Sequence, residues 1–300
     1  MTITIATVFY GGEKLLQQTV PTWFQAAAAY PGIYFSFVDN SPDPIKPLLA
    51  GLDGFDANTV DYVHRPHNPG FAASANEALQ SAGTDWVFLV NPDVYLDTTS
   101  LGAIIKFATG SHAYDVAAVS MLTAGKWMCG IALSSYGYFV DRTDVRTACL
   151  GASGGAGLFK RDTFLHHGGF DDDLFAWGED AGLAIRMRAA GISVAQLDLR
   201  LVHEGGHSVD SLRGQRFKAA LLARNRIRVL RRGFARSLAY TLGPVIILTM
   251  LINGIRKIPA GTASPHFTGM FTGLSERNAH SDHPKLSLSQ FLDYRRATAE

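Results

Sequence analysis

The sequence predicts an α/β fold with a mainly parallel central sheet, followed by C-terminal helices. Short apolar segments alternate with helix-like or turn-rich segments, and they are residues 2–10, 33–38, 60–65 and 86–90. The last of them, WVFLV, is apolar without interruption, which is typical of a parallel strand covered on both faces. The chain has 300 residues, 47% of them apolar, and can therefore bury a full core.

The helices of the first half are predicted from their periodicity and their ends. A helix is expected over residues 13–28, directly after the first strand and a glycine pair. A second helix is expected after the third strand, with Asn68 as N-cap, Pro69 at its first position and Gly83 beyond its end. Its apolar face would pack on the sheet.

The second half is less regular. A strand is expected at residues 116–121, and SSYGYFV at 134–140 suggests a strand of a smaller mixed sheet. Four glycines within residues 151–157 indicate backbone that approaches another group closely. A helix is expected from residue 179 to 190, ending at Gly191.

Charge and cysteine content limit the class of protein. The formal net charge is +1, so no global field favours nucleic acid, and we expect no nucleic-acid partner. The two cysteines, Cys129 and Cys149, form no CxxC pair and suit a reducing compartment. The N-terminus lacks the features of a signal peptide, which leads us to expect a cytoplasmic protein.

The last third changes character. Residues 213–236 contain nine Lys or Arg and no acid, in an amphipathic pattern, and residues 237–255 carry no charge. We expect Gly243-Pro244 to break the second helix, which favours a helix pair lying on a membrane surface over a membrane span. A buried helix hairpin or a dimer contact fits the composition equally well. The polar residues 261–300 are expected to pack loosely.

Two acids follow predicted strands, Asp39 and Asp93. In open α/β sheets the ligand crevice lies outside the carboxyl ends of the strands, so both would lie on one rim. Asp93, assisted by Asn91, could hold Mg²⁺ or Mn²⁺ together with substrate phosphate, because hard cations prefer oxygen ligands. A turn or helix-cap role for Asp93 is the alternative.

Two further clusters carry candidate chemistry. In FAWGED, Glu179 and Asp180 open a helix after Trp177, so a carboxylate there could act as general base or could simply favour the helix dipole. In VHEGGHS, His203 and His207 suggest one metal ligand and one phosphate contact, or two structural histidines. The motifs GxGxxG and GxxxxGK[ST] are absent, which argues against a dinucleotide-binding dehydrogenase and a P-loop kinase.

Taken in order, the motifs resemble glycosyltransferase family 2, especially bacterial rhamnosyltransferases that extend lipid-linked glycans. The resemblance covers roughly residues 2–210. It rests on VDNS, NPGFAASAN, LVNPDV, the stretch from GASGGAG to WGED, Arg186 and VHEGGHS. It implies a GT-A fold, a nucleotide-sugar donor, a divalent cation (Mg²⁺ or Mn²⁺) and inversion at the anomeric carbon.

The resemblance also implies roles for individual residues. Asp93 and His203 would be the metal ligands, with His207 as the competing histidine, and Asp180 would be the catalytic base. Asp39 would contact the nucleoside. The implied donor-binding set is Tyr10, Asp39, Arg65, Asn76 and Asn91. The implied acceptor-binding set is Gly154, Gly155, Trp177 and Glu179.

One position departs from the family pattern. The family commonly has a further acid two residues after the base, and this chain has Gly182 there. Arg186 is thereby expected to lose its natural i,i+4 partner. Acceptor binding, and activity itself, are open to question on that ground.

The resemblance leads to a functional expectation. The chain would transfer rhamnose from dTDP-rhamnose to a glycan or a polyprenyl-diphosphate-linked glycan in bacterial surface polysaccharide synthesis, at the cytoplasmic face of the inner membrane. A UDP-hexose donor, another acceptor, a catalytically idle nucleotide- or glycan-binding subunit and a homodimer remain alternatives. The expected divisions are 1–210 (catalytic, in halves 1–110 and 111–210), 211–260 (basic and apolar helices, with membrane contact through 213–255) and 261–300 (polar tail).

Overall fold

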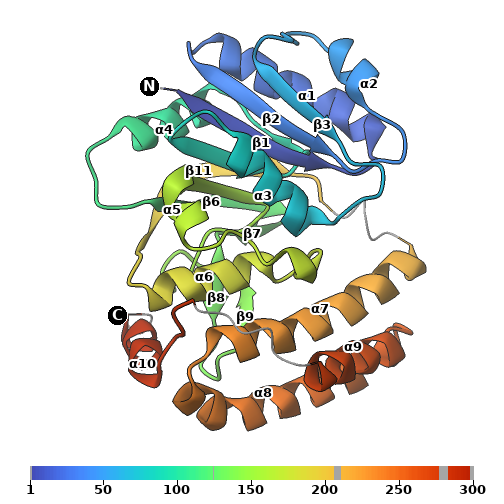
Figure 1. The fold of residues 1–300 in the computed structure, drawn as a ribbon, viewed down its shortest axis with the longest axis vertical. Coiled ribbons are helices and arrows are strands. Elements are labelled where there is room, and N and C mark those ends of the chain that lie inside the picture. Colours follow the sequence, from blue (N-terminus) through green and yellow to red (C-terminus); the bar gives the residue numbers. More distant parts are fainter. Residues whose placement is uncertain (1, 124, 206–210, 277–282, 298–300) are drawn as a thin grey trace.

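The fold is seen in a computed structural model that describes residues 2–123, 125–205, 211–276 and 283–297. An α/β layer forms one end of the molecule and a set of helices forms the other (Figure 1). The first half of the α/β layer contains β1 (Ile3–Phe9), α1 (Glu13–Ala28), β2 (Ile33–Asp39), α2 (Lys46–Ala50), β3 (Val60–His64), α3 (Phe71–Ser81) and β4 (Trp86–Val90).

The second half completes the central sheet and adds a small hairpin. Its elements are β5 (Val94–Tyr95), α4 (Thr98–Thr109), β6 (Val116–Thr123), β7 (Lys126–Met128), β8 (Ile131–Leu133), β9 (Phe139–Asp141), β10 (Ala156–Lys160), α5 (Arg161–His166), η1 (Asp172–Leu174), α6 (Glu179–Ala189) and β11 (Val194–His203). The strand order is β3-β2-β1-β4-β10-β6-β11-β5, with β7 on β6. Neighbours are parallel except where β5, β7 and β10 take part, so the predicted mainly parallel sheet is confirmed.

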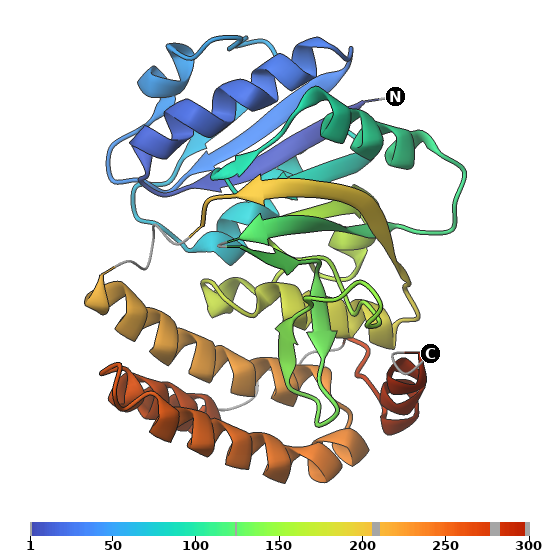
Figure 2. The ribbon, with the colours of Figure 1, turned by 180° about the vertical axis from the view of Figure 1, so that it is seen from behind.

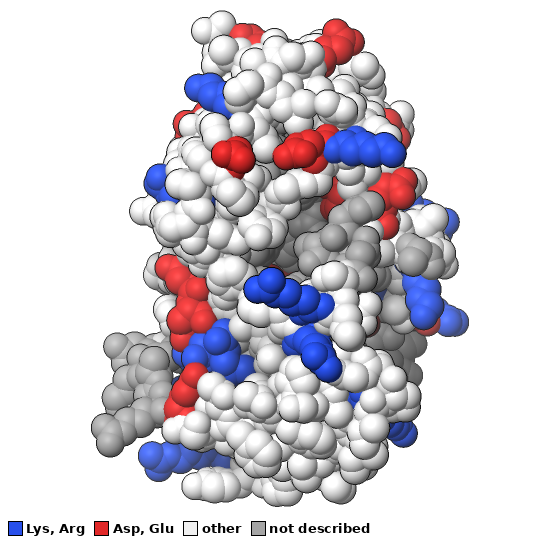
Figure 3. All heavy atoms as spheres, turned by 90° about the vertical axis from the view of Figure 1, so that its right-hand side faces the viewer, with Lys and Arg blue, Asp and Glu red and all other residues white. Residues whose placement is uncertain are grey.

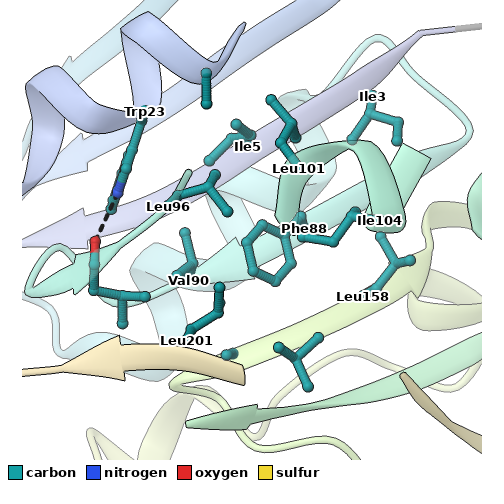
Figure 4. Close-up of a cluster of buried hydrophobic side chains, with 14 of the residues drawn as sticks. Ile3, Ile5, Trp23, Phe88, Val90, Leu96, Leu101, Ile104, Leu158 and Leu201 are labelled. Carbon is teal, nitrogen blue, oxygen red and sulfur yellow. Dashed lines mark hydrogen bonds between the residues drawn. The ribbon is translucent and has the colours of Figure 1, made fainter. Parts of the chain in front are cut away.

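The two faces of β4 belong to two different cores. Trp86, Phe88 and Val90 pack toward α1 and α4, while Val87 and Leu89 pack toward α3 and α6. This period of two is what a strand covered on both sides requires. The close-up in Figure 4 shows the first core, where the Trp23 indole Nε1 donates to the Val94 carbonyl at 2.7 Å and ties α1 to β5.

The predicted start of α3 was wrong by two residues. Asn68 lies in the left-handed region, at φ 45°, and its Oδ1 accepts from the Gly70 amide at 3.1 Å. Gly70 has φ 100°, and a side chain there would collide with Phe175. The Asn68 side chain therefore closes a turn before the helix, and the helix starts at Phe71.

The C-terminal third is helical and packed, which corrects the expected loose tail. Its helices are α7 (Leu212–Gly233), α8 (Arg236–Arg256), α9 (Ala263–Ser275) and α10 (Leu288–Arg296). Met270, Phe291 and Tyr294 are buried in a third core shared with α6, α7 and the β8–β9 hairpin. Figure 2 shows this hairpin extending from the sheet toward α7 and α8. The prediction of a loose tail was based on the polar residues of this segment, whereas its few apolar residues are the ones that pack into the core.

The expected break at Gly243-Pro244 is also wrong, because α8 runs through both residues. Proline leaves the carbonyl four residues earlier without its helical bond. That residue, Tyr240, is 81% exposed, so water can reach this turn of the helix. The basic and apolar segment therefore forms two long helices, α7 and α8.

Candidate active site

The candidate site lies where the carboxyl ends of the parallel strands meet. Asn91 follows β4, and its backbone N–H donates to the Gly155 carbonyl at 2.9 Å, just before antiparallel β10 begins. Two residues later the short strand β5 pairs with the end of β11, with Val94 opposite His203. This pairing brings Asp93 and His203 together although 110 positions separate them in the sequence.

The side chains of Asp93 and His203 face each other, as two metal-coordinating groups would. His203 Nε2 lies 2.9 Å from Asp93 Oδ1, and both side chains are largely buried. Despite that distance, Asp93 Oδ1 has no hydrogen-bond partner among the described residues, because the two groups do not align for a hydrogen bond. The Thr123 hydroxyl lies 2.9 Å from His203 Nδ1 and fixes the ring.

This pair fits a divalent cation. A carboxylate oxygen and an imidazole nitrogen are both accepted by Mn²⁺ and Mg²⁺, and an unpartnered buried carboxylate oxygen is explained by a cation between the two groups. The described residues contain no group of three or more His, Cys, Asp or Glu side chains placed to bind a metal ion. Two protein ligands leave the remaining coordination positions to other oxygens, such as those of a diphosphate.

The acid pair lies across the glycine turn from this site. Asp180 Oδ2 accepts from the Gly154 amide at 3.1 Å, and its Oδ1 accepts from the Ala181 amide at 2.7 Å. Glu179 is 5% exposed, and its Oε2 has no partner in the described parts of the chain. Burial raises the pKa of both carboxyls, and the charge of Asp180 raises the pKa of Glu179 further. A carboxyl with a raised pKa is suited to proton transfer near neutral pH.

Glycines 154 and 155 connect the two halves of the site. A β-carbon on Gly154 would lie 3.3 Å from Glu179 Oε1, and one on Gly155 would lie 3.3 Å from Asn91 Nδ2. The structure thus confirms the predicted close approach of this backbone. The fold brings Asn91, Glu179 and Asp180 together around the turn formed by Gly154 and Gly155. Whether the turn contacts an acceptor stays a prediction.

The loop that leads into the acid pair has an unusual backbone. Phe175 and Trp177 have φ of 68° and 62°, which non-glycine residues rarely adopt, and Gly178 follows at 110°. Asn225, fully buried on α7, donates from Nδ2 to the carbonyls of Leu174 and Ala176 at 2.8 Å and of Trp177 at 3.0 Å. One amide on a distant helix thus holds the loop in shape.

Asn225 was missed by the sequence analysis. The available signal was an uncharged amide within the helix segment LLARNRIRVL, at a position that shares a face with Leu221 and Leu222. A buried polar residue among apolar ones needs partners. The partners could not be named, because they lie about 50 positions earlier.

Trp177 lies against α7. Lys218 Nζ is 5.4 Å from the centroid of its ring, and the Phe217 ring centroid is 6.1 Å away. This arrangement is a cation–π contact at the edge of the candidate site. The predicted stacking of Trp177 on an acceptor sugar stays a prediction.

The residues predicted to bind the donor are not all available for it. The Asp39 carboxylate is completely buried and accepts from the amides of Ser41 and Ile45, each at 2.9 Å, and from the Tyr62 hydroxyl. It shapes the loop after β2, and a direct contact with a nucleoside, which stays a prediction, would require exchange of one of these bonds. Tyr10 is exposed after β1, and Arg65 forms an ion pair with Glu77.

The side-chain amide of Asn76 forms hydrogen bonds within the protein. Its Oδ1 accepts from the Phe170 amide at 2.8 Å, while its Nδ2 donates to the Phe170 carbonyl at 2.8 Å and to Asp172 Oδ1 at 2.6 Å. Every hydrogen-bonding group of this amide joins α3 to Phe170 or to the first residue of η1. In the structure Asn76 therefore connects the two halves of the fold, and its contact with a donor stays a prediction.

Arg186 has a partner, which corrects the expectation drawn from Gly182. Its Nη1 bonds Asp171 Oδ2 at 3.0 Å, Nε donates to the His167 carbonyl at 3.2 Å, and Nη2 donates to the Gly169 carbonyl. A β-carbon at Gly182 would lie 3.2 Å from the same Asp171 oxygen. The carboxylate thus comes from residue 171, and the glycine leaves room for it. His207, the other secondary candidate, lies outside the described residues.

The fold is that of a GT-A glycosyltransferase. The chain belongs to glycosyl transferase family 2, whose family model matches residues 4–162. No curated protein matches the chain in sequence.

GalNAc-T7 and PcManGT are two of the solved structures that share the fold. GalNAc-T7 with UDP, GalNAc and Mn²⁺ superposes with a TM-score of 0.59 at 13% identity, over 79% of this chain and 48% of that one. The chain thus spans about half the length of GalNAc-T7. The mannosyltransferase PcManGT from Pyrobaculum calidifontis, in complex with GDP-Man and Mn²⁺, superposes with a TM-score of 0.57 at 14% identity, over 99% of this chain and 79% of that one. At such identities the likeness shows the fold.

Proposed function

We propose that this protein is an inverting, metal-dependent glycosyltransferase that uses a nucleotide-sugar donor. The observation that carries the proposal is the pairing of Asp93 Oδ1 with His203 Nε2, at 2.9 Å and without a hydrogen bond. The half-buried acid Asp180 lies on the same rim, across the glycine turn. A metal site and a base on one rim are the two parts that such a transfer needs.

Each protein group has a task in this reaction. Asp93 and His203 would hold Mg²⁺ or Mn²⁺, which would supply positive charge to neutralise the departing nucleoside diphosphate. Asp180 accepts the proton of the acceptor hydroxyl, and its raised pKa matches that task. The Gly154 amide fixes the Asp180 carboxylate, and Glu179, buried beside it, favours its own protonated form.

The donor of choice is dTDP-rhamnose, and this choice rests on the sequence resemblance to rhamnosyltransferases. GalNAc-T7 with UDP and PcManGT with GDP-Man, both with Mn²⁺, support a nucleotide-linked substrate and a manganese ion. A UDP-hexose is the second choice. The acceptor we propose is a glycan or a polyprenyl-diphosphate-linked glycan of a bacterial surface polysaccharide.

A donor panel tests the proposal. Nucleoside diphosphate release from dTDP-rhamnose and from the common UDP- and GDP-sugars is followed with Mn²⁺ and with Mg²⁺, with and without glycan acceptors. The wild type, Asp93→Ala and Asp180→Asn are compared with Asp61→Asn, a control that changes an exposed acid on β3. Release from one donor, abolished by the two site variants and kept by the control, is the expected result. Nucleotide binding without release under any condition would favour an idle binding subunit.

Peripheral membrane contact is a second proposal, supported by α8. Its most apolar window of 18 residues has a mean hydropathy of 1.8, and only 22% of that window is buried. By length and composition, α8 is the one helix among the described residues that could cross a membrane. Its exposed apolar side chains are Tyr240, Val245, Leu248, Leu251, Ile252 and Ile255. Figure 3 shows a broad uncharged surface at this end of the molecule, bordered by Lys and Arg. We propose that this surface lies on the cytoplasmic face of the inner membrane.

Vesicle co-sedimentation tests the membrane contact. Leu248→Ser and Ile255→Ser should reduce binding to vesicles of phosphatidylcholine and phosphatidylglycerol, while Val145→Ser, at an exposed apolar residue away from α8, should not. The alternative occupant of this surface is a second copy of the chain. A dimer in light scattering that the same two serine variants dissociate, without vesicle binding by the wild type, would replace the membrane proposal.

A further inference from the structure

A cavity lies among the C-terminal helices, and none of the residues that line it belongs to the acid pair or the proposed metal ligands. Its volume is about 260 Å³, and it lies between α7, α8 and α9, beside the end of the β8–β9 hairpin (Figure 1). The lining residues that matter here are Tyr138, Arg226, Asn253, Arg256, Lys257 and His266. Three of them are cations, and no lining residue is an acid.

Arg226 is the deepest of the three cations. Its guanidinium stacks on the Tyr138 ring at 3.7 Å from the centroid, Nη1 bonds the Tyr138 hydroxyl at 2.5 Å, and Nη2 donates to the Phe139 carbonyl at 3.1 Å. Its Nε is buried without a hydrogen-bond partner among the described residues. All its partners are therefore neutral, and one donor remains unused.

The neighbouring arginines of α7 are treated differently. Arg228 bonds Glu276 and Asp173, and Arg232 bonds Asp173. Arg226, unlike these two arginines, forms no ion pair among the described residues, although the charge of Asp141 on β9 also acts on it. A buried cation without an ion-pair partner is costly, so its retention at the cavity points to an anion that binds there.

The other two cations come from the end of α8. Arg256 is exposed and Lys257 half-buried, and neither side chain forms a hydrogen bond or ion pair within the described ranges. The amide of Asn253 lies one turn before them and donates to the Tyr138 hydroxyl at 3.3 Å. Three like charges around one cavity repel one another, and an anion between them would remove that cost.

We propose that this cavity binds a phosphate-bearing anion. Arg226, Arg256 and Lys257 supply the charge, and Asn253 and the Tyr138 hydroxyl supply neutral hydrogen-bonding groups. The volume is below that of a site for a whole cofactor, which favours a group of the size of a phosphate or diphosphate. The exposed side chains of Ile255 and Ile258 lie next to the two outer cations in the chain, so a phosphate carried on a lipid has apolar surface nearby.

The test compares two double variants. Arg256→Ala with Lys257→Ala removes two cations from the cavity, at positions exposed enough to leave the fold intact. The control, Arg213→Ala with Arg236→Ala, removes two exposed cations from the first turns of α7 and α8, and neither residue lines the cavity. Thermal unfolding should show the same midpoint for both. Calorimetry with inorganic pyrophosphate is run in EDTA, so that a metal-dependent diphosphate site does not contribute.

Pyrophosphate should bind the wild type and the control alike and bind the cavity variant at least tenfold more weakly. A second measurement identifies the source of the phosphate with vesicles of phosphatidylcholine, with and without phosphatidylglycerol. Phosphatidylglycerol-dependent binding that falls in the cavity variant alone assigns the site to a lipid headgroup. A fall in pyrophosphate binding alone assigns it to a soluble phosphate. If the cavity variant and the control behave alike in both measurements, the proposal is wrong.

Discussion

The Asp171–Arg186 ion pair provides a quantitative test of how the fold compensates for Gly182. Arg186 is only 5% exposed, and its Nη1 lies 3.0 Å from Asp171 Oδ2. Removing one partner of a buried pair costs about 3–5 kcal/mol. Since Arg186 keeps its bonds to the carbonyls of His167 and Gly169, we expect the lower limit, about 3 kcal/mol, for Asp171→Ala. For a chain of this size that corresponds to a fall of roughly 6 °C in the unfolding midpoint.

The carboxylate should be transferable to residue 182. A β-carbon there would lie 3.2 Å from the Asp171 oxygen, and residue 182 precedes Arg186 by four positions on α6. Gly182→Asp in the Asp171→Ala background should therefore restore about 1–2 kcal/mol of the lost stability. Gly182→Asp alone should destabilise the protein, because two carboxylates about 4 Å apart repel by about 4 kcal/mol at an effective dielectric constant near 20, before Arg186 offsets part of this.

Urea unfolding of the single and double variants measures these differences. Replacing a helical glycine adds about 1 kcal/mol through helix propensity alone, so the required control is Gly182→Ala in the Asp171→Ala background. The aspartate double variant should be more stable than the alanine double variant. Equal stabilities would show that Arg186 does not need a carboxylate at this place, and the explanation of Gly182 would fail.

Three further predictions concern single buried groups. Burial holds the pKa of Glu179 above its ordinary value, so the folded protein favours the protonated carboxyl and loses stability as the pH rises through that raised pKa. In urea unfolding, the stability of Glu179→Gln relative to the wild type should therefore increase from pH 5 to pH 9. A difference in stability that stays constant over this range would contradict this. Asn225→Ala removes the donor to three loop carbonyls and should cost about 2 kcal/mol of stability. In the donor assay it should lower kcat more than it changes KM, and an unchanged kcat would show that the loop holds its shape without Asn225. Asn76→Ala should cost about 1–3 kcal/mol of stability and leave the donor KM unchanged, whereas a raised donor KM would return this residue to the donor pocket.

The order of elements in the first ninety residues could be predicted because their signals are local. The helix Glu13–Ala28 is found at its predicted bounds, and β1, β2, β3 and β4 are found within one or two residues of theirs. Strand and helix periods are properties of neighbouring residues, so one sequence is enough to see them. The start of α3 failed because a side-chain turn at Asn68 competes with a helix cap, and the same residue types serve both.

Most of the contacts that could not be predicted from the sequence join residues that lie far apart in the chain. Asp93 and His203 meet through β5, a strand of two residues that has no detectable period. The partner of Arg186 comes from Asp171, fifteen positions earlier, where the sequence shows only one acid among several. Such contacts depend on how elements dock, and the spacing of residues along one helix does not contain that information.

The loop before the acid pair shows why the C-terminal helices belong to the working unit. Phe175 and Trp177 each hold a backbone conformation that costs about 1–3 kcal/mol, and such strain persists only where surrounding structure enforces it. That structure is Asn225 of α7, whose three hydrogen bonds offset about 1 kcal/mol each. The family model ends at residue 162, before this loop, the acid pair and α7. Because the loop sets the direction of Glu179 and Asp180, the geometry of the proposed base depends on a helix that lies beyond the matched part of the chain.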